Sequence, residues 1–220
     1  NPREAAPTVN SKAIVGLLTF YNEQTPLVVT VGISGTGIEG ARRNLDAECP
    51  GFDFEKVKSA TQEKWRTQLA KIEVEGGTKD QKTTFYTALY HTMIAPNLWN
   101  DVDGSYRGRD NQVHPNPGHD VYTVFSLWDT HRALHPLLTI LEPKRTSDFV
   151  QTFLRQYEQS GRLPVWELAA NETECMIGNH SIAVIADAYA KGIRGFDLRL
   201  ALEAMEKTVG RNSPDLNAYR

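Results

Sequence analysis

The stretch that decides the fold is Ser126–Leu137, with the sequence SLWDTHRALHPL. It follows the alternating run Val121–Phe125, which predicts a short strand, and it leads into the apolar run Ala133–Leu141, which predicts a helix. A strand-to-helix junction therefore carries an aromatic ring, a carboxylate and a guanidinium. These groups belong to Trp128, Asp129 and Arg132.

The chemistry of this junction favours sugar binding. Such junctions often line clefts, because rigid elements hold the loop on both sides. The indole of Trp128 can stack on the apolar face of a sugar ring, and ionised groups such as Asp129 and Arg132 bond hydroxyls more strongly than neutral groups do. The structural alternatives are a core position for Trp128 and a helix-capping role for Asp129.

A second dense region, Gly161–His180, joins two predicted helices and is long for such a connection. It contains Trp166 and Glu167, two more glutamates and two asparagines, and it ends on a histidine near a helix start. This composition is typical of a functional rim. In the structural alternative, Trp166 is a core aromatic, Glu167 is a solvated charge and His180 is a hydrogen-bonded structural histidine.

The composition excludes several classes of protein. Of 220 residues, 40% are hydrophobic and 23% are charged, which is ordinary for a soluble globular chain. A net charge of −3 and the lack of any basic run argue against a nucleic-acid binder. No stretch is long and apolar enough to span a bilayer. For Cys49 and Cys175, two free thiols are favoured over a disulfide.

The first part of the chain predicts two strands, Ala13–Tyr21 and Pro26–Ser34, separated by a turn. Two strands cannot bury a sheet face on their own, so we expect them to be the end of a larger β domain. Helical patterns follow, and Asp53 is the expected N-cap of the second. They cover residues 39–48, 53–72, 80–96, 128–141, 144–160, 178–191 and 195–209.

Residues 97–120 have the composition of a loop, rich in Asn, Asp, Gly and Pro. Within them, the run Asp101–Tyr106 together with Asp110 is similar to a calcium loop. The twelve-residue pattern with its terminal glutamate is absent, so a tight turn with side-chain hydrogen bonds is the favoured interpretation.

Several strings, taken in order and spacing, resemble glycoside hydrolase family 92, the α-mannosidases of the bacterial α-1,2-mannosidase type. The resemblance extends over nearly the whole chain. The strings are Val31–Ser34 with Ala41–Leu45, Phe85–Thr92, Asp101–Gly108, Ser126–Thr130, Leu163–Glu167, and Cys175–Gly178 with His180.

The resemblance implies a mainly α fold, the first part of an (α/α)6 toroid preceded by the last strands of a β-sandwich domain and a linker helix. On this basis we expect the end of the sandwich in residues 1–50, the linker helix in 51–77 and an incomplete toroid in 78–220. The family also implies exo-acting, inverting, Ca2+-dependent removal of α-1,2-linked mannose from glycans, including N-glycan degradation. A periplasmic or extracellular location goes with it.

The same resemblance leaves the catalytic residues out of this chain. The family's acid and base motifs, and a calcium-site glutamate motif, do not occur here, and we expect the acid and base downstream of Arg220. We therefore expect an internal fragment that is inactive alone. Six residues are the candidates for substrate binding, with Asp129 expected to bind hydroxyls of the terminal mannose. They are Trp128, Asp129, Arg132, Trp166, Glu167 and His180.

Two alternatives remain open at this point. One is a non-catalytic helical module that binds carbohydrate or another partner through the same rim. The other is a different (α/α) toroid glycosidase, since aromatic and acidic loops at helix starts recur in such folds.

Overall fold

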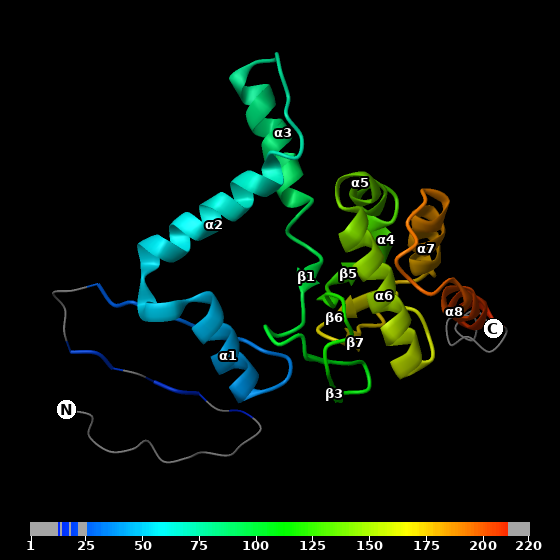
Figure 1. Ribbon diagram of the computed structural model, residues 1–220, viewed down its shortest axis with the longest axis horizontal. Coiled ribbons are helices and arrows are strands. Elements are labelled where there is room, and N and C mark those ends of the chain that lie inside the picture. The colour runs from blue at the N-terminus through cyan, green and yellow to red at the C-terminus, as the bar shows by residue number, and fades with distance from the viewer. Residues whose placement is uncertain (1–12, 14, 18, 22–25, 211–220) are drawn as a thin grey trace.

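The computed structural model describes residues 13, 15–17, 19–21 and 26–210, and it is mainly helical. Figure 1 shows an extended arm, formed by α1, α2 and α3, beside a helical unit that contains α4 to α8. Short strands lie at the base of the helical unit. None of the helices in the described part of the chain is long and apolar enough to cross a membrane.

The three helices of the arm confirm the predicted pattern, and local signals explain their ends. They are α1 (Ile38–Glu48), α2 (Phe54–Leu69) and α3 (Lys79–His91). Asp53 caps α2 as predicted, by accepting a hydrogen bond from the backbone N–H of Lys56 at 3.0 Å. Thr78 and Gln81 form a reciprocal capping box at the start of α3. Helix α3 ends at His91, several residues before the end predicted at Pro96, and Thr92 is its C-cap.

The two strands predicted at 13–21 and 26–34 are not formed by the described residues of these stretches. Their apolar side chains are exposed, 96% for Val15 and 90% for Leu17. Alternating apolar residues form a strand only when a neighbouring strand takes up the backbone hydrogen bonds and a second layer covers the apolar face. Residues 14, 18 and 22–25 lie outside the described part of the chain.

Short antiparallel pairings replace the predicted loop and the predicted strand at 121–125. They form three small sheets. The first pairs β1 (Asn97–Leu98) with β4 (Tyr122–Thr123), the second pairs β2 (Tyr106–Arg107) with β3 (Val113–His114), and the third has the order β5 (Phe125–Ser126), β6 (Trp166–Leu168), β7 (Asn171–Glu172). The strand predicted at 121–125 is divided because Val124 has a φ of 69°.

The helix predicted at 128–141 is also divided, into α4 (Leu127–Thr130) and α5 (Leu134–Leu141). Pro136 explains the break. It has no N–H to donate to a preceding turn, and its ring would contact the carbonyl four residues earlier, so a helix can begin near it but cannot run through it.

The core of the helical unit is built around α6 (Pro143–Ser160), which packs against α5, α7 (His180–Ala190) and α8 (Leu198–Val209). Phe149 and Phe153 of α6 are fully buried, and Phe125 of β5 makes edge-to-face contacts with both, at centroid distances of 5.6 and 4.7 Å. The strand that leads to the Trp128 segment is therefore anchored on the central helix.

A buried carboxylate connects the arm to the helical unit. Asp101, only 2% exposed, accepts hydrogen bonds from Ser34 Oγ at 2.7 Å, Thr36 Oγ1 at 2.5 Å and Asn44 Nδ2 at 2.8 Å. The backbone of Asp101 also closes the tight turn with Gly104 and Ser105, which confirms the turn predicted from the sequence. Asp101 is thus a structural residue that ties α1 to the loop before β2.

Removal of the Phe153 ring should destabilise the protein strongly. Phe153→Ala deletes a fully buried side chain and leaves a cavity, which typically lowers the free energy of unfolding by about 3–5 kcal/mol. Leu202→Ala, on the exposed face of α8, is the control and should change it by less than about 1 kcal/mol. Urea unfolding followed by circular dichroism measures both. Equal effects of the two substitutions would contradict the proposed core.

Candidate functional site

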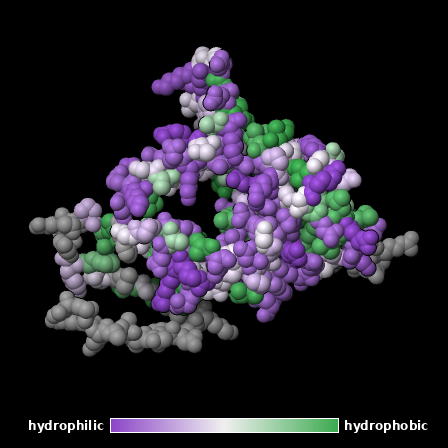
Figure 2. Space-filling model, viewed as in Figure 1, coloured by the Kyte–Doolittle hydropathy of each residue, from purple (hydrophilic) through white to green (hydrophobic). Residues whose placement is uncertain are grey.

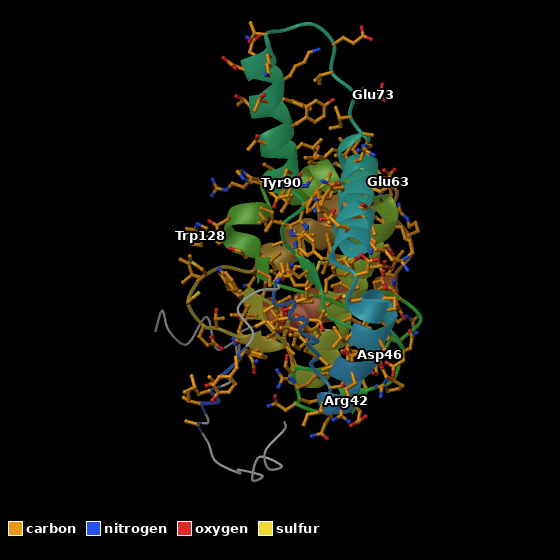
Figure 3. The ribbon with its side chains drawn as sticks, turned by 90° about the vertical axis from the view of Figure 1, so that its left-hand side faces the viewer. Arg42, Asp46, Glu63, Glu73, Tyr90 and Trp128 are labelled. Carbon is orange, nitrogen blue, oxygen red and sulfur yellow. The ribbon has the colours of Figure 1, made fainter. Side chains whose placement is uncertain are left out.

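The predicted strand-to-helix junction exists, and it presents Trp128 and Asp129 at the surface. Strand β5 passes directly into α4, and both side chains are exposed, Trp128 by 39%. Asp129 Oδ2 accepts a hydrogen bond from Ser126 Oγ at 2.5 Å, which fixes the carboxylate at the start of the helix. Figure 3 shows Trp128 projecting from the edge of the helical unit, away from α2.

Two histidines continue the surface formed by Trp128. The ring of His180 lies edge-on to that of Trp128, with centroids 5.7 Å apart, and it is stacked on the ring of His131 at 4.1 Å and 10°. Burial lowers the pKa of His180, and the nearby positive charges of His131 and Arg132 lower it further. The imidazole is therefore mostly neutral at pH 7, and it can donate or accept a hydrogen bond.

The antiparallel pairing of β5 with β6 brings the second sequence region to the same place. Trp166 is opposite Ser126, and Glu167 is opposite Phe125. Successive side chains of a strand point to opposite faces, so Trp166 shares the face of Ser126, whereas Glu167 shares the buried face of Phe125. Trp166 and Ser126, which donates a hydrogen bond to Asp129, thus lie on one side of the sheet, and Glu167 lies on the other.

Glu167 is completely buried, with 0% exposure. Its Oε1 accepts hydrogen bonds from Thr123 Oγ1 at 2.9 Å and from the backbone N–H of Ala170 at 2.6 Å. Burial raises the pKa of Glu167 to about 7, although these bonds and the positive charge of Arg109 favour the charged form. A carboxyl group held in this way beneath the surface cannot reach a substrate bound at Trp128.

Two further charged residues, Glu172 and Arg109, support the strand that carries Trp166, and no sequence motif indicates this role. The oxygens of Glu172 accept hydrogen bonds from the backbone N–H groups of Val165 at 2.9 Å and Trp166 at 2.8 Å. The guanidinium of Arg109, whose side chain is only 5% exposed, lies 3.7 Å from Glu172. Burial lowers the pKa of Arg109. Arg109 and Glu172 are far apart in the sequence, and neither belongs to a recognisable local motif. Their pairing can therefore be seen only in the folded structure.

The described residues, 13–210 apart from 14, 18 and 22–25, contain no group of three or more His, Cys, Asp or Glu side chains placed to hold a metal ion. No residue of this part of the chain is therefore assigned to the Ca2+ ion that the resemblance implies. Cys49 and Cys175 are both free, as the sequence favoured.

The profile of the glycosyl hydrolase family 92 catalytic domain matches residues 40–219. The chain belongs to this family. Its match begins in α1 and runs through the whole helical unit, so α5 to α8 correspond to part of the family's (α/α) toroid.

Solved structures agree with this assignment. The family 92 α-mannosidase BT3965 from Bacteroides thetaiotaomicron superposes with a TM-score of 0.79 and is 37% identical. The same enzyme has also been solved in complex with mannoimidazole. The family 92 inverting mannosidase BT2199 from the same organism has a TM-score of 0.76 and is 34% identical. The superpositions cover 84% and 83% of this chain but only 25% of each relative.

A curated relative, described as an uncharacterized secreted glycosidase of the fungus Arthroderma benhamiae, is 30% identical over 199 residues. The match covers 88% of this chain and 21% of that protein. This chain thus spans between a fifth and a quarter of the length of these relatives.

The buried ring of His135 should make the stability of the protein depend on pH. Both ring nitrogens lack a hydrogen-bond partner among the described residues, and burial lowers the pKa from 6.5 to about 4, with a further contribution from His131. Between pH 6.5 and 4 the unfolded state binds a proton that the folded state does not. The free energy of unfolding therefore decreases as the pH is lowered, by roughly 1.4 kcal/mol per pH unit from this group.

His135→Leu should remove this dependence, so that the variant gains on the unsubstituted protein as the pH falls from 6.5 to 4.5. Urea unfolding of both proteins at several pH values measures the difference. The contribution of Glu167, whose raised pKa favours the folded state as the pH falls through 7, cancels in that difference. Parallel curves for the two proteins would contradict the expectation.

Proposed function

We propose that the whole protein containing this chain is an exo-acting, inverting α-mannosidase that removes terminal α-linked mannose from glycans. The observation that carries the proposal is the surface formed by Trp128, Asp129, Trp166 and His180, which two distant sequence regions build together in a chain of family 92. The names of the two solved relatives, an α-mannosidase and an inverting mannosidase, support this chemistry.

The residues of this chain would bind and orient the sugar. The exposed indole of Trp128 offers a stacking face for a pyranose ring, and the carboxylate of Asp129, held by Ser126, can accept hydrogen bonds from two neighbouring hydroxyls. Arg132 is exposed and lies close enough to His180 to affect its pKa, and the neutral imidazole of His180 can complete the polar contacts. Such groups fix the terminal sugar in one orientation.

Inversion further needs an acid on the leaving oxygen and a base that activates water on the opposite face of the ring. Glu167 is fully buried on the opposite face of the strand from Trp166, so it is not available for either role at the proposed surface. We therefore assign the acid and the base to parts of the whole protein that this chain does not include.

Finer properties of the proposed enzyme follow from the family resemblance. They are a preference for α-1,2 linkages, a role in N-glycan degradation, and dependence on Ca2+ bound mostly by ligands outside this chain. A periplasmic or extracellular location is supported by the secreted relative.

Asp129→Asn in the whole protein should lower kcat/KM for an α-mannoside about 10- to 100-fold. The substitution removes the charge from a hydrogen bond to substrate, and bonds to charged groups are worth roughly 1.5–3 kcal/mol. Asp187→Asn, which removes the carboxylate of a surface pair with Lys191, should leave kcat/KM unchanged. Initial rates on an aryl α-mannoside compare the variants. An unaltered rate in Asp129→Asn would remove Asp129 from the site.

Residues 1–220 expressed alone should release no mannose from α-1,2-mannobiose, with or without added Ca2+. The chain supplies binding groups without the acid and base that inversion requires. It should also aggregate, since large apolar side chains such as Val15, Leu17 and Ile33 are exposed. Mannose release and size-exclusion chromatography measure both properties. Turnover from a monodisperse sample would place the catalytic pair within this chain.

A further inference from the structure

The buried carboxylate of Glu167 is the meeting point of two turns that have unusual backbone conformations. Val124 separates β4 from β5 with a φ of 69°, and Ala169 and Ala170 connect β6 to β7 with φ values of 50° and 65°. In this left-handed region the Cβ of an ordinary residue crowds its own backbone, and β-branched valine is the least suited to it. Three such residues persist only where neighbouring groups hold them in place.

The hydrogen bonds that hold these turns converge on Glu167. The carboxylate accepts the backbone N–H of Ala170 at 2.6 Å and the hydroxyl of Thr123 at 2.9 Å, and this hydroxyl in turn accepts the backbone N–H of Ala169 at 2.7 Å. Thr123 directly precedes Val124, so the bond from its hydroxyl to the carboxylate holds the first turn as well. One side chain thus links both turns, directly or through Thr123.

Each turn sets the direction of one half of the proposed sugar-binding surface. The chain leaves Val124 into Phe125 and Ser126, and from there into the helix that carries Trp128 and Asp129. The turn at 169–170 fixes the strand that carries Trp166 against the strand that supplies Glu172. If either turn relaxed, the pairing of Ser126 with Trp166, which sets the two segments against each other, would be lost.

We propose that Glu167 is a positioning residue, which keeps the Trp128–Asp129 segment and Trp166 in one fixed arrangement by holding the left-handed turns at Val124 and at Ala169–Ala170. The importance of this arrangement for sugar hydrolysis rests on the proposed function. Glu167 itself does not touch the substrate, because it lies on the buried face of the sheet.

The surroundings of Glu167 suit a group with a fixed structural task. A small cavity of about 10 Å³ adjoins the carboxyl group, and its charged or titratable lining comes from the β2–β3 hairpin and α6: Tyr106, Arg107, Arg109 and Arg155. Arg107 Nη2 donates to the carbonyl of Ala169 at 3.2 Å, so the turn is held from its other side as well. The Oε2 atom of Glu167 has no hydrogen-bond partner among the described residues.

The test uses Glu167→Gln in the whole protein, with hydrogen exchange measured by mass spectrometry. The amide cannot reproduce the charge-assisted bonds, so exchange of the amides in segments 119–131 and 164–173 should become at least about tenfold faster. Exchange in α8, which lies outside this network, should not change. Glu63→Gln, which alters an exposed carboxylate paired with Arg66 on α2, is the control and should leave both segments unchanged.

A rescue experiment separates positioning from a general loss of stability. Glycine adopts left-handed φ values freely, so Ala169→Gly together with Ala170→Gly should restore slow exchange in segment 164–173 of the Glu167→Gln protein. In the same series, kcat/KM for an aryl α-mannoside should fall about 10- to 100-fold in Glu167→Gln and recover at least partly in the triple variant. If Glu167→Gln does not fold, Thr123→Val replaces it in the test. This substitution removes the bridging hydroxyl without changing the side-chain size, and it should also make hydrogen exchange in both segments faster.

Unchanged exchange in both segments for Glu167→Gln and Thr123→Val would overturn the proposal, as would a failure of the glycines to restore slow exchange. The exchange measurement does not depend on the reaction. If the unsubstituted protein hydrolyses no α-mannoside while exchange responds as expected, the proposed function fails and the positioning role of Glu167 stands.

Discussion

The antiparallel pairing of β5 with β6 is the contact on which the rest of the helical unit depends. It joins two regions of the sequence that are far apart, and its alternation sorts their side chains. Phe125 and Glu167, which are cross-strand partners, face the core, whereas Ser126 and Trp166 face the surface that carries Trp128. A shift of one residue in this register would bury Trp166 and expose Glu167, and it would destroy the core and the surface together.

This pairing also explains why a carboxyl group occupies the core beneath a sugar-binding surface. A buried charge is unfavourable unless it is hydrogen-bonded and compensated, and the raised pKa of Glu167 reflects that unfavourable environment. An apolar residue would remove the penalty, but it could not accept the N–H groups of turns whose backbones are otherwise unstable. The buried carboxyl group therefore lowers the stability of the protein somewhat, while its hydrogen bonds hold two turns in a defined geometry.

The sequence was sufficient for those features that extend over several turns of helix or occur in a recognisable string. Helices α1, α2, α6, α7 and α8 were predicted close to their observed ends, because each carries several periods of the apolar pattern. Two strings supplied the candidates Trp128, Asp129, Arg132, Trp166, Glu167 and His180, and the sugar-binding role of the exposed ones stays a prediction. The burial of Glu167 was not predicted, because the string Leu163–Glu167 contains no information on which face of so short a strand is buried.

Other misses have the same physical origin, since they depend on partners that lie elsewhere in the chain. Strands of two residues show no visible period, so β1 to β3 were hidden in an apparent loop. The ring of His131 belongs to the quoted stretch, but only the fold stacks it on His180. Arg109 is charged, and composition alone would place it in solvent, whereas a contact with Glu172 keeps it buried.

The helices of the arm are stabilised differently from those of the helical unit. Helix α2 has no buried residue, and Figure 2 shows mostly hydrophilic residues over it. Packing therefore contributes little to its stability, and local interactions take a larger share. These are the Asp53 cap and the surface pairs of Glu55 with Lys58 and Glu63 with Arg66, each worth only tenths of a kcal/mol. Beyond α2, Lys71 contacts Glu142 at the start of α6, and Trp65 packs on Tyr90 with centroids 4.6 Å apart. A helix held in this way keeps its length through local interactions and its two ends, without a core of buried side chains around it.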